Sequence, residues 1–218
     1  MPGPLQTLRA AWTYIQLVRD PNQLDKVFDL ISSAQREHPE VLEKLGRIPA
    51  VGEFLANPWS MECPDLDTLG RLPPGSLGRV FADHLRANDL DPAALFRAHP
   101  DDGMGWLNAH FEQTHDIWHV LTGFETDVPG ELGLQCFYLA QIEGPPPMAI
   151  LSAGLLHTTI KHPDDIAVTM EAVTRGWRIG RAAKPLFGVR WDQRWSKPLA
   201  AIRKEFGLPS DGGLEQVA

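Results

Sequence analysis

The sequence contains little cysteine and no long uncharged apolar run. Its two cysteines, Cys63 and Cys136, lie far apart and form no CxxC pair, so neither a disulfide framework nor a zinc knuckle is indicated, and a reducing compartment fits best. No apolar run reaches the roughly eighteen uncharged residues of a strong membrane span. The N-terminus, with Pro2 and Pro4, does not resemble a signal peptide and has too little Arg and Ser for a transit peptide. We therefore expect a protein that is soluble or at most peripheral to a membrane.

Also absent is the alternation of apolar and polar residues that half-buried strands show. Apolar residues recur instead at helical spacing, over residues 5–19 and again around 24–31 and 39–46. The 218 residues are enough for one domain with a sizeable core. We predict an all-α fold, a single-domain helical bundle over residues 1–218, interrupted by an irregular loop at about 57–75 that is rich in Pro, Gly and Asp.

Charge is distributed unevenly along the chain. The formal net charge is −8, yet residues 175–204 contain nine Lys or Arg and a single acid, whereas residues 1–174 contain 11 basic and 24 acidic residues. We expect basic helices over residues 163–208. An acidic body with a basic C-terminal segment argues against nucleic-acid binding and favours a local anionic partner.

Two imidazoles and a carboxylate are concentrated at His115, Asp116 and His119. On a helix with about 100° per residue, His115 and His119 lie roughly 40° apart, and Asp116 is about 60° beyond His119. All three side chains therefore point into one narrow sector. Two His at i and i+4 are the usual way in which a helix presents a divalent metal.

A second carboxylate, Glu131, follows twelve residues after His119. Residues 122–123 have the character of a helix end, and residues 127–129 that of a helix cap and first turn. An antiparallel hairpin would place His119 and Glu131 both about 6 Å from the turn. The sequence thus predicts a His₂(carboxylate)₂ metal cluster across two helices, with a buried hydrogen-bonded network without metal as the alternative.

Residues 148–160 are nearly all apolar and small. A helix of this length spans only about 20 Å, too short to cross a bilayer. It is either a central core helix or, because residues 152–154 are small, a helix that approaches its neighbours closely or leaves room for an apolar ligand. His157 near its end could support a metal ligand, although a hydrogen-bonded His at a helix end is the simpler expectation.

The last predicted helix, residues 191–206, has an apolar stripe that includes Trp191 and Trp195 beside basic residues. Trp and basic residues on one amphipathic helix favour an anionic membrane surface. The alternative is a helix that packs on the protein through this stripe. Of the remaining histidines, we expect His84 to border the core and His99 to mark a helix end, with no chemical role for either.

Four blocks of the sequence resemble the coenzyme Q (ubiquinone) biosynthesis protein 4 family, and the resemblance extends over roughly residues 5–208. The first block is the HDxxH motif followed by eleven residues and Glu. The second is a Leu-Pro-x-Gly-Thr-Leu-Gly pattern at residues 72–79, in which Ser76 replaces the Thr. The third is the hairpin with Gly123, Gly130 and Glu131, and the fourth is a Trp-x-x-x-Trp-x-x-Pro-Leu pattern with a following Arg, here Trp191, Trp195, Pro198, Leu199 and Arg203.

The resemblance implies an all-helical fold and a metal, usually taken as zinc, held by His115, Asp116, His119 and Glu131. It also implies a role in ubiquinone biosynthesis, peripheral membrane association, binding of polyprenylated ring intermediates and assembly with other pathway enzymes. The activity attached to the family replaces the C1 carboxylate of a polyprenylated 4-hydroxybenzoate-derived precursor with a hydroxyl. Because no long N-terminal extension is present, we expect a bacterial member that is cytoplasmic and peripheral on the inner membrane, and we also expect a homodimer.

Three hypotheses follow for the function. In the first, the four residues form the catalytic centre of a metal-dependent enzyme: the two histidines are neutral ligands, and the carboxylates are ligands or, for one of them, a proton acceptor. Such a set suits zinc, and also iron or manganese. In the second, the protein is a non-catalytic lipid-binding scaffold in which residues 148–160 line an apolar prenyl-lipid cavity. A metallohydrolase is the third and weakest, because the acid spacing differs from HExxH and no phosphate-binding Gly-rich loop is present.

Overall fold

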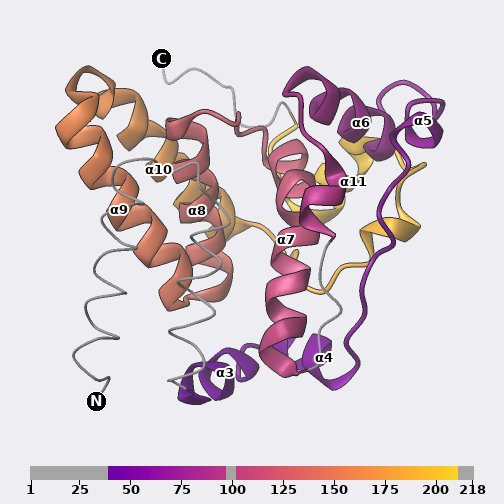
Figure 1. The fold of residues 1–218 in the computed structure, drawn as a ribbon, viewed down its shortest axis with the longest axis horizontal. Coiled ribbons are helices and arrows are strands. Elements are labelled where there is room, and N and C mark those ends of the chain that lie inside the picture. Colours follow the sequence, from indigo (N-terminus) through magenta and orange to yellow (C-terminus); the bar gives the residue numbers. More distant parts are fainter. Residues whose placement is uncertain (1–38, 97–101, 211–218) are drawn as a thin grey trace. The chain divides into compact units, whose positions relative to one another are not determined.

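The computed structural model describes residues 39–96 and 102–210, apart from the side chains of Pro145 and Pro146 (Figure 1). All regular structure in these residues is helical, and the only β-type pairing among them is an isolated bridge between Ser76 and Pro198. The predicted all-α fold is confirmed, and α3 (Pro39–Gly46) confirms the third N-terminal helix. The helices predicted over residues 5–19 and 24–31 lie outside the described residues, as does His99.

The contacts between residues divide the described part of the chain into two compact units, within each of which most contacts are made. The α7 unit consists of residues 49–96, 102–126 and 182–210, and the α8 unit consists of residues 39–48 and Asp127–Arg181. Each unit contains helices with its own buried apolar residues. The predicted single domain over residues 1–218 stays a prediction.

The α7 unit is built around one long helix, α7 (Gly103–Thr122). The Asp102 carboxylate caps its start by accepting a hydrogen bond from the Gly105 N–H at 2.6 Å. Gly123 ends it in the left-handed conformation, with φ 71°, which confirms the helix end predicted at residues 122–123. Nearly every residue of α7 from Leu107 to Thr122 is buried or half-buried, so the helix is the core of this unit. The shorter elements of the unit are α4 (Pro49–Ala56), α5 (Leu66–Leu69), α6 (Leu77–Ala87), η1 (Pro92–Leu95), η3 (Trp191–Gln193) and α11 (Leu199–Phe206), of which α4, α6 and η1 contact α7 most closely.

Two segments far apart in the sequence are joined at the start of α6. Ser76 is the N-cap residue: its hydroxyl accepts from the Arg79 N–H at 3.4 Å and donates to the Pro73 carbonyl at 2.6 Å. The next two N–H groups, of Leu77 and Gly78, donate to carbonyls of residues 197 and 195, each at 2.9 Å. These are orphan donors of a helix start, and they are satisfied by a remote segment. The loop at residues 57–75 is irregular as predicted, except for the single turn of α5.

The prediction of one helix over residues 191–206 is wrong. The short helix η3 ends at Gln193, and α11 begins only after Pro198, whose neighbour Leu199 donates its N–H to the Gly75 carbonyl at 2.8 Å. The intervening segment pairs with the start of α6 instead of continuing a helix. Trp191 is fully buried, and Leu199, Ile202 and Phe206 are also buried. The apolar stripe therefore packs inside the unit, which confirms the protein-docked alternative over a membrane contact through this stripe.

The α8 unit contains α3, α8 (Val128–Ile142), α9 (Pro145–Lys161), η2 (Pro163–Asp165) and α10 (Ile166–Ala182). The Asp127 carboxylate caps α8 by accepting from the Gly130 N–H at 2.8 Å, as predicted from residues 127–129. Small residues allow close helix contacts here: a Cβ at Gly154 of α9 would overlap the Leu132 side chain of α8.

Helix α9 is not a fully buried core helix. Leu151 and Ala153 are buried, but Met148, Leu156 and Ile160 are 51%, 41% and 59% exposed. The apolar residues of α9 therefore lie on both its packed face and its exposed face. Its composition alone does not show which of them are buried. No helix in the part of the chain that the structure describes combines the length and the hydrophobicity needed to span a bilayer.

Candidate metal centre

The three residues predicted to share one sector of a helix do so on α7. His115, Asp116 and His119 each offer a ligand atom, and these atoms all lie within 4.8 Å of one another. All three are buried, with exposed fractions of 6%, 9% and 1%. Buried imidazole and carboxylate groups gathered at one point are the donor set that zinc, iron and manganese accept.

The ring of His119 is oriented by the chain reversal that follows α7. Its Nδ1 lies 2.9 Å from the Phe124 carbonyl, which can only accept, so Nδ1 carries the proton and Nε2 presents its lone pair. This is the arrangement in which a backbone carbonyl fixes the tautomer of a metal-binding His. Gly123 makes the arrangement possible, because its left-handed conformation turns the chain directly before Phe124.

The spacing of the two imidazoles fits a shared cation. His119 Nε2 lies 3.2 Å from His115 Nε2, and the two rings are nearly perpendicular, with centroids 4.8 Å apart. Two nitrogens that each lie about 2.0–2.1 Å from one tetrahedral zinc would be about 3.3 Å apart. The observed separation is therefore suitable for both nitrogens to bind one ion without a change of helix geometry.

Glu131 lies in the first turn of α8, in the other unit, and is half-buried. Its place as the fourth ligand, and the hairpin that would bring it to His119, stay predictions. His157 also belongs to the α8 unit, where it is buried. Its ring centroid lies 5.3 Å from that of His162.

Sequence reasoning overlooked His84, which is on α6. Its ring stacks against that of His119, with centroids 5.9 Å apart and an interplanar angle of 24°. Burial lowers the pKa of His84 from its ordinary value, an effect that positive charge on His119 would increase and that the carboxylates of Asp116 and Glu125 oppose. The sequence carried no signal for this contact, because His84 and His119 are on different helices.

Helix α7 is anchored along its length by polar contacts to other segments of its unit. The Gln113 amide accepts from the Met61 N–H at 3.0 Å and donates to the Ser60 hydroxyl at 2.8 Å. At the other end, the Arg203 guanidinium of α11 donates to the carbonyls of Leu121 and Val120 at 3.0 and 2.9 Å. These carbonyls belong to the last turn of α7, where helices leave acceptors unsatisfied.

About one turn before the candidate metal group, His110 is a core histidine of α7. It is 1% exposed and packs against the rings of Phe54, Trp59 and Phe187, with centroids 4.6, 5.2 and 4.4 Å away. Burial lowers its pKa to about 3, and its Nε2 accepts a hydrogen bond from the Gly188 N–H at 3.0 Å. His110 is thus a neutral packing residue and not a ligand.

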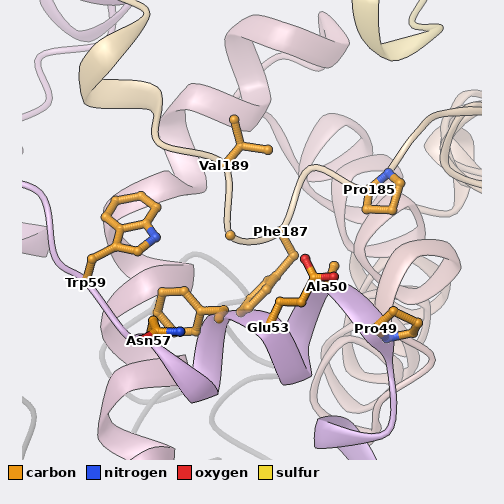
Figure 2. A pocket seen from close by; sticks show the side chains of 10 residues that line it. Pro49, Ala50, Glu53, Asn57, Trp59, Pro185, Phe187 and Val189 are labelled. Carbon is orange, nitrogen blue, oxygen red and sulfur yellow. The ribbon is translucent and has the colours of Figure 1, made fainter.

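A cavity of about 430 Å³ in the α7 unit is lined by aromatic, proline and small residues (Figure 2). Trp59 and Phe187 form part of its wall, together with Glu53 of α4 and Asn57, which directly follows this helix. Its lining includes no residue of α9. The apolar cavity that we expected beside residues 148–160 therefore remains a prediction, and it is distinct from this one.

Comparison with known proteins assigns the family. The profile of the family described as coenzyme Q (ubiquinone) biosynthesis protein Coq4 matches residues 59–211, which include all four sequence blocks and with them the whole candidate metal motif. The chain belongs to this family.

Curated relatives carry the same description. The mitochondrial ubiquinone biosynthesis protein COQ4 homologue of Rattus norvegicus is 30% identical over 151 residues, which cover 68% of this chain and 56% of the rat protein. That of Bos taurus is 27% identical over 208 residues, 93% of this chain and 78% of the bovine protein. The match thus spans just over half the length of the rat relative.

A solved structure extends the similarity to the fold. A crystal structure from Nostoc punctiforme, whose description names ubiquinone biosynthesis, is 31% identical and superposes with a TM-score of 0.79. The superposition covers 91% of this chain and 96% of the Nostoc chain. The resemblance that the sequence motifs indicated is therefore confirmed.

Proposed function

We propose that this protein acts in ubiquinone biosynthesis as a metal-dependent enzyme on a polyprenylated 4-hydroxybenzoate-derived acid. The observation that carries the proposal is the buried His115–Asp116–His119 group, in which the Phe124 carbonyl holds His119 with Nε2 directed to His115. Membership of the Coq4 family supplies the pathway.

The proposed reaction replaces the ring carboxylate at C1 with a hydroxyl. The carboxylate leaves as CO₂ and the ring carbon gains oxygen, a two-electron oxidation for which we propose dioxygen as oxidant, its second oxygen being reduced to water by an external donor. A divalent metal held by His115, Asp116, His119 and, as predicted, Glu131 would supply Lewis acidity or access to dioxygen chemistry. Zinc is our first expectation for this metal, with iron or manganese as alternatives.

The side chains of the site would bind and orient the aromatic acid. His115 and His119 serve as neutral ligands, since the Phe124 carbonyl keeps the His119 proton on Nδ1. Asp116 or Glu131, whichever is not needed as a ligand, accepts the phenolic proton. The burial of the group limits access of water to the reacting ring.

We further propose that the protein contacts the membrane peripherally, because its polyprenylated substrate resides there. Support comes from exposed apolar side chains in the α8 unit, among them Ile160 of α9 and Met170 and Trp177 of α10, which are 59%, 46% and 43% exposed. In a bacterium this membrane would be the inner one, reached from the cytoplasm. A homodimer and assembly with other ubiquinone-biosynthesis enzymes belong to the same proposal.

The alternative is a non-catalytic scaffold that binds prenylated lipid and organises other enzymes of the pathway. The exposed apolar side chains of α9 and α10 favour this alternative, because they offer a surface on which lipid or a partner enzyme could bind. The two functions differ in turnover, not in metal content.

Elemental analysis of protein purified without chelators or metal-affinity tags tests the metal centre. We expect about one equivalent of metal in the wild type, its loss in His119→Ala, and its retention in His162→Ala, a control on the exposed His162 of the other unit. Metal-replete protein is then incubated with the prenylated acid under dioxygen with a reductant. Release of CO₂ with formation of the hydroxylated ring supports the enzyme, while retention of unchanged lipid supports the scaffold. Equal metal in the wild type and His119→Ala would refute the site.

A further inference from the structure

His84 is placed beside the candidate metal centre with an unused polar atom. Its ring stacks on that of His119, yet none of the residues in 39–96 and 102–210 forms a hydrogen bond with its Nε2, which is buried. Most buried polar atoms have a partner, and one that lacks a partner at a functional site requires an explanation. If Nε2 carries a proton it can donate a hydrogen bond, and if it does not it can only accept one.

Asn88, at the C-terminal end of α6, determines that state. The atom of its amide that lies 2.9 Å from the His84 carbonyl must be the NH₂, because a carbonyl only accepts. The amide oxygen is then the atom that accepts from the Thr126 hydroxyl at 2.8 Å. The same NH₂ is 3.5 Å from His84 Nδ1, so a proton on Nδ1 would face another donor. The network therefore assigns the proton of a neutral His84 to Nε2.

The donor at Nε2 does not depend on the protonation of the ring, since an imidazolium also carries a proton there. The charged and titratable groups that act on His84 are His115, His119, Asp116 and the exposed Glu125. His119 already gives its Nδ1 proton to the Phe124 carbonyl and directs Nε2 to His115. A buried N–H at the edge of this group is suited to an anionic oxygen that binds there.

We propose that His84 is a ligand-binding residue, whose Nε2–H donates a hydrogen bond to a carboxylate oxygen of the aromatic acid bound at the His115–Asp116–His119 group. The stacking of His84 on His119 and its buried, unpartnered Nε2 are features of the structure, while the binding of an acid at this point rests on the proposed function. His84 would thereby orient the carboxylate that the reaction removes. In the scaffold alternative it would hold the same carboxylate without turnover.

Two variants separate the hydrogen bond from ring packing. His84→Phe keeps a flat ring against His119 but has no donor, whereas His84→Gln places an amide N–H near the position of Nε2. The matched control is His162→Phe in the α8 unit. The probe is 4-hydroxybenzoate, titrated calorimetrically at pH 8 into full-length protein, both with and without one equivalent of zinc. Metal content and thermal unfolding are recorded for each protein.

We expect His84→Phe to weaken binding of 4-hydroxybenzoate by about 10- to 100-fold, because a hydrogen bond to a charged group is lost. Zinc content should stay at the wild-type value. His84→Gln should stay within about threefold of wild type, and His162→Phe should be unchanged. Long-range ¹H–¹⁵N correlation spectra of the histidine rings should place the His84 proton on Nε2 at pH 8.

Four results would overturn the proposal: equal affinity in His84→Phe and wild type, equal weakening in His84→Phe and His84→Gln, a proton on Nδ1, or no binding of the probe by the wild type. Loss of zinc in His84→Phe would likewise replace this role with support of the metal. If the wild type holds no zinc, the proposed metal-dependent function fails, and the titration without zinc still decides the role of His84.

Discussion

Arg203 offers the sharpest test of how α7, the helix that carries the candidate metal group, is held. Its guanidinium donates to the Leu121 carbonyl through Nε at 3.0 Å, to Val120 through Nη2 at 2.9 Å and to Ser210 through Nη1 at 2.9 Å. The first two carbonyls belong to the last turn of α7, directly after His119. We choose Arg203→Met, which keeps most of the aliphatic stem and removes all donors.

The expected loss follows from these contacts. Leu121 is fully buried and Val120 is 6% exposed, so water compensates poorly for the lost donors. A buried acceptor without a partner costs about 1–3 kcal/mol, and a positive charge at a helix C-terminus contributes about 0.3–1 kcal/mol. We expect the free energy of unfolding to fall by about 3 kcal/mol, which lowers Tm by about 6–12 °C in a chain of this length.

Urea unfolding followed by circular dichroism, together with calorimetric Tm, measures the loss. Lys204→Met, at the adjacent exposed position of α11, is the matched control and should change the unfolding free energy by less than about 0.5 kcal/mol. If Arg203→Met and Lys204→Met unfold alike, the bonds to α7 do not stabilise the fold, and our account of how α7 is anchored is refuted.

Two further predictions concern other parts of the core. His110 has a folded-state pKa of about 3, below its ordinary 6.5, so the unfolded chain binds the proton first and stability is lost as pH falls from about 6.5 toward 3. Urea unfolding should therefore show wild type losing up to about 3 kcal/mol more than His110→Gln between pH 7 and 4; parallel losses would contradict the buried neutral ring. In the α8 unit, a Cβ at Gly176 would overlap the Gly133 carbonyl, which is backbone and cannot rotate away. Gly176→Ala should lower the free energy of unfolding by about 1–3 kcal/mol and lower Tm accordingly, whereas Thr174→Ala on the exposed face of α10 should leave both nearly unchanged. Equal Tm values for the two variants would contradict the close packing.

The parts of the fold that sequence reasoning predicted are those with local causes. Helix α7 ends at Gly123 because a glycine adopts the left-handed conformation there, and α8 begins at Asp127 because its carboxylate caps the first turn. The shared sector of His115, Asp116 and His119 follows from helix geometry alone. Each of these features involves residues within a few positions of one another.

The errors have non-local causes. Residues 191–206 carry helical periodicity, but the segment before Leu199 bonds instead to the start of α6, more than a hundred residues earlier. The exposure of Leu156 and Ile160 on α9 depends on which of its faces meets α8, and an all-apolar composition does not encode that choice. His84 was missed for the same reason, because the ring that it stacks against, that of His119, is on another helix. Tertiary contacts override local preference in each case.

The contacts that no local pattern predicts are also those that shape the candidate site. Gln113 is fixed by the loop at Ser60 and Met61, and the last turn of α7 is fixed by Arg203 of α11. Between these two anchors, the Phe124 carbonyl sets the tautomer of His119. These contacts hold α7 on both sides of the candidate metal group, so a metal that bound there would need to supply little of the energy that orders the helix. A group organised in this way would hold a metal in one geometry, and the proposed role of His84 as a donor to the ligand would then come from a separate helix.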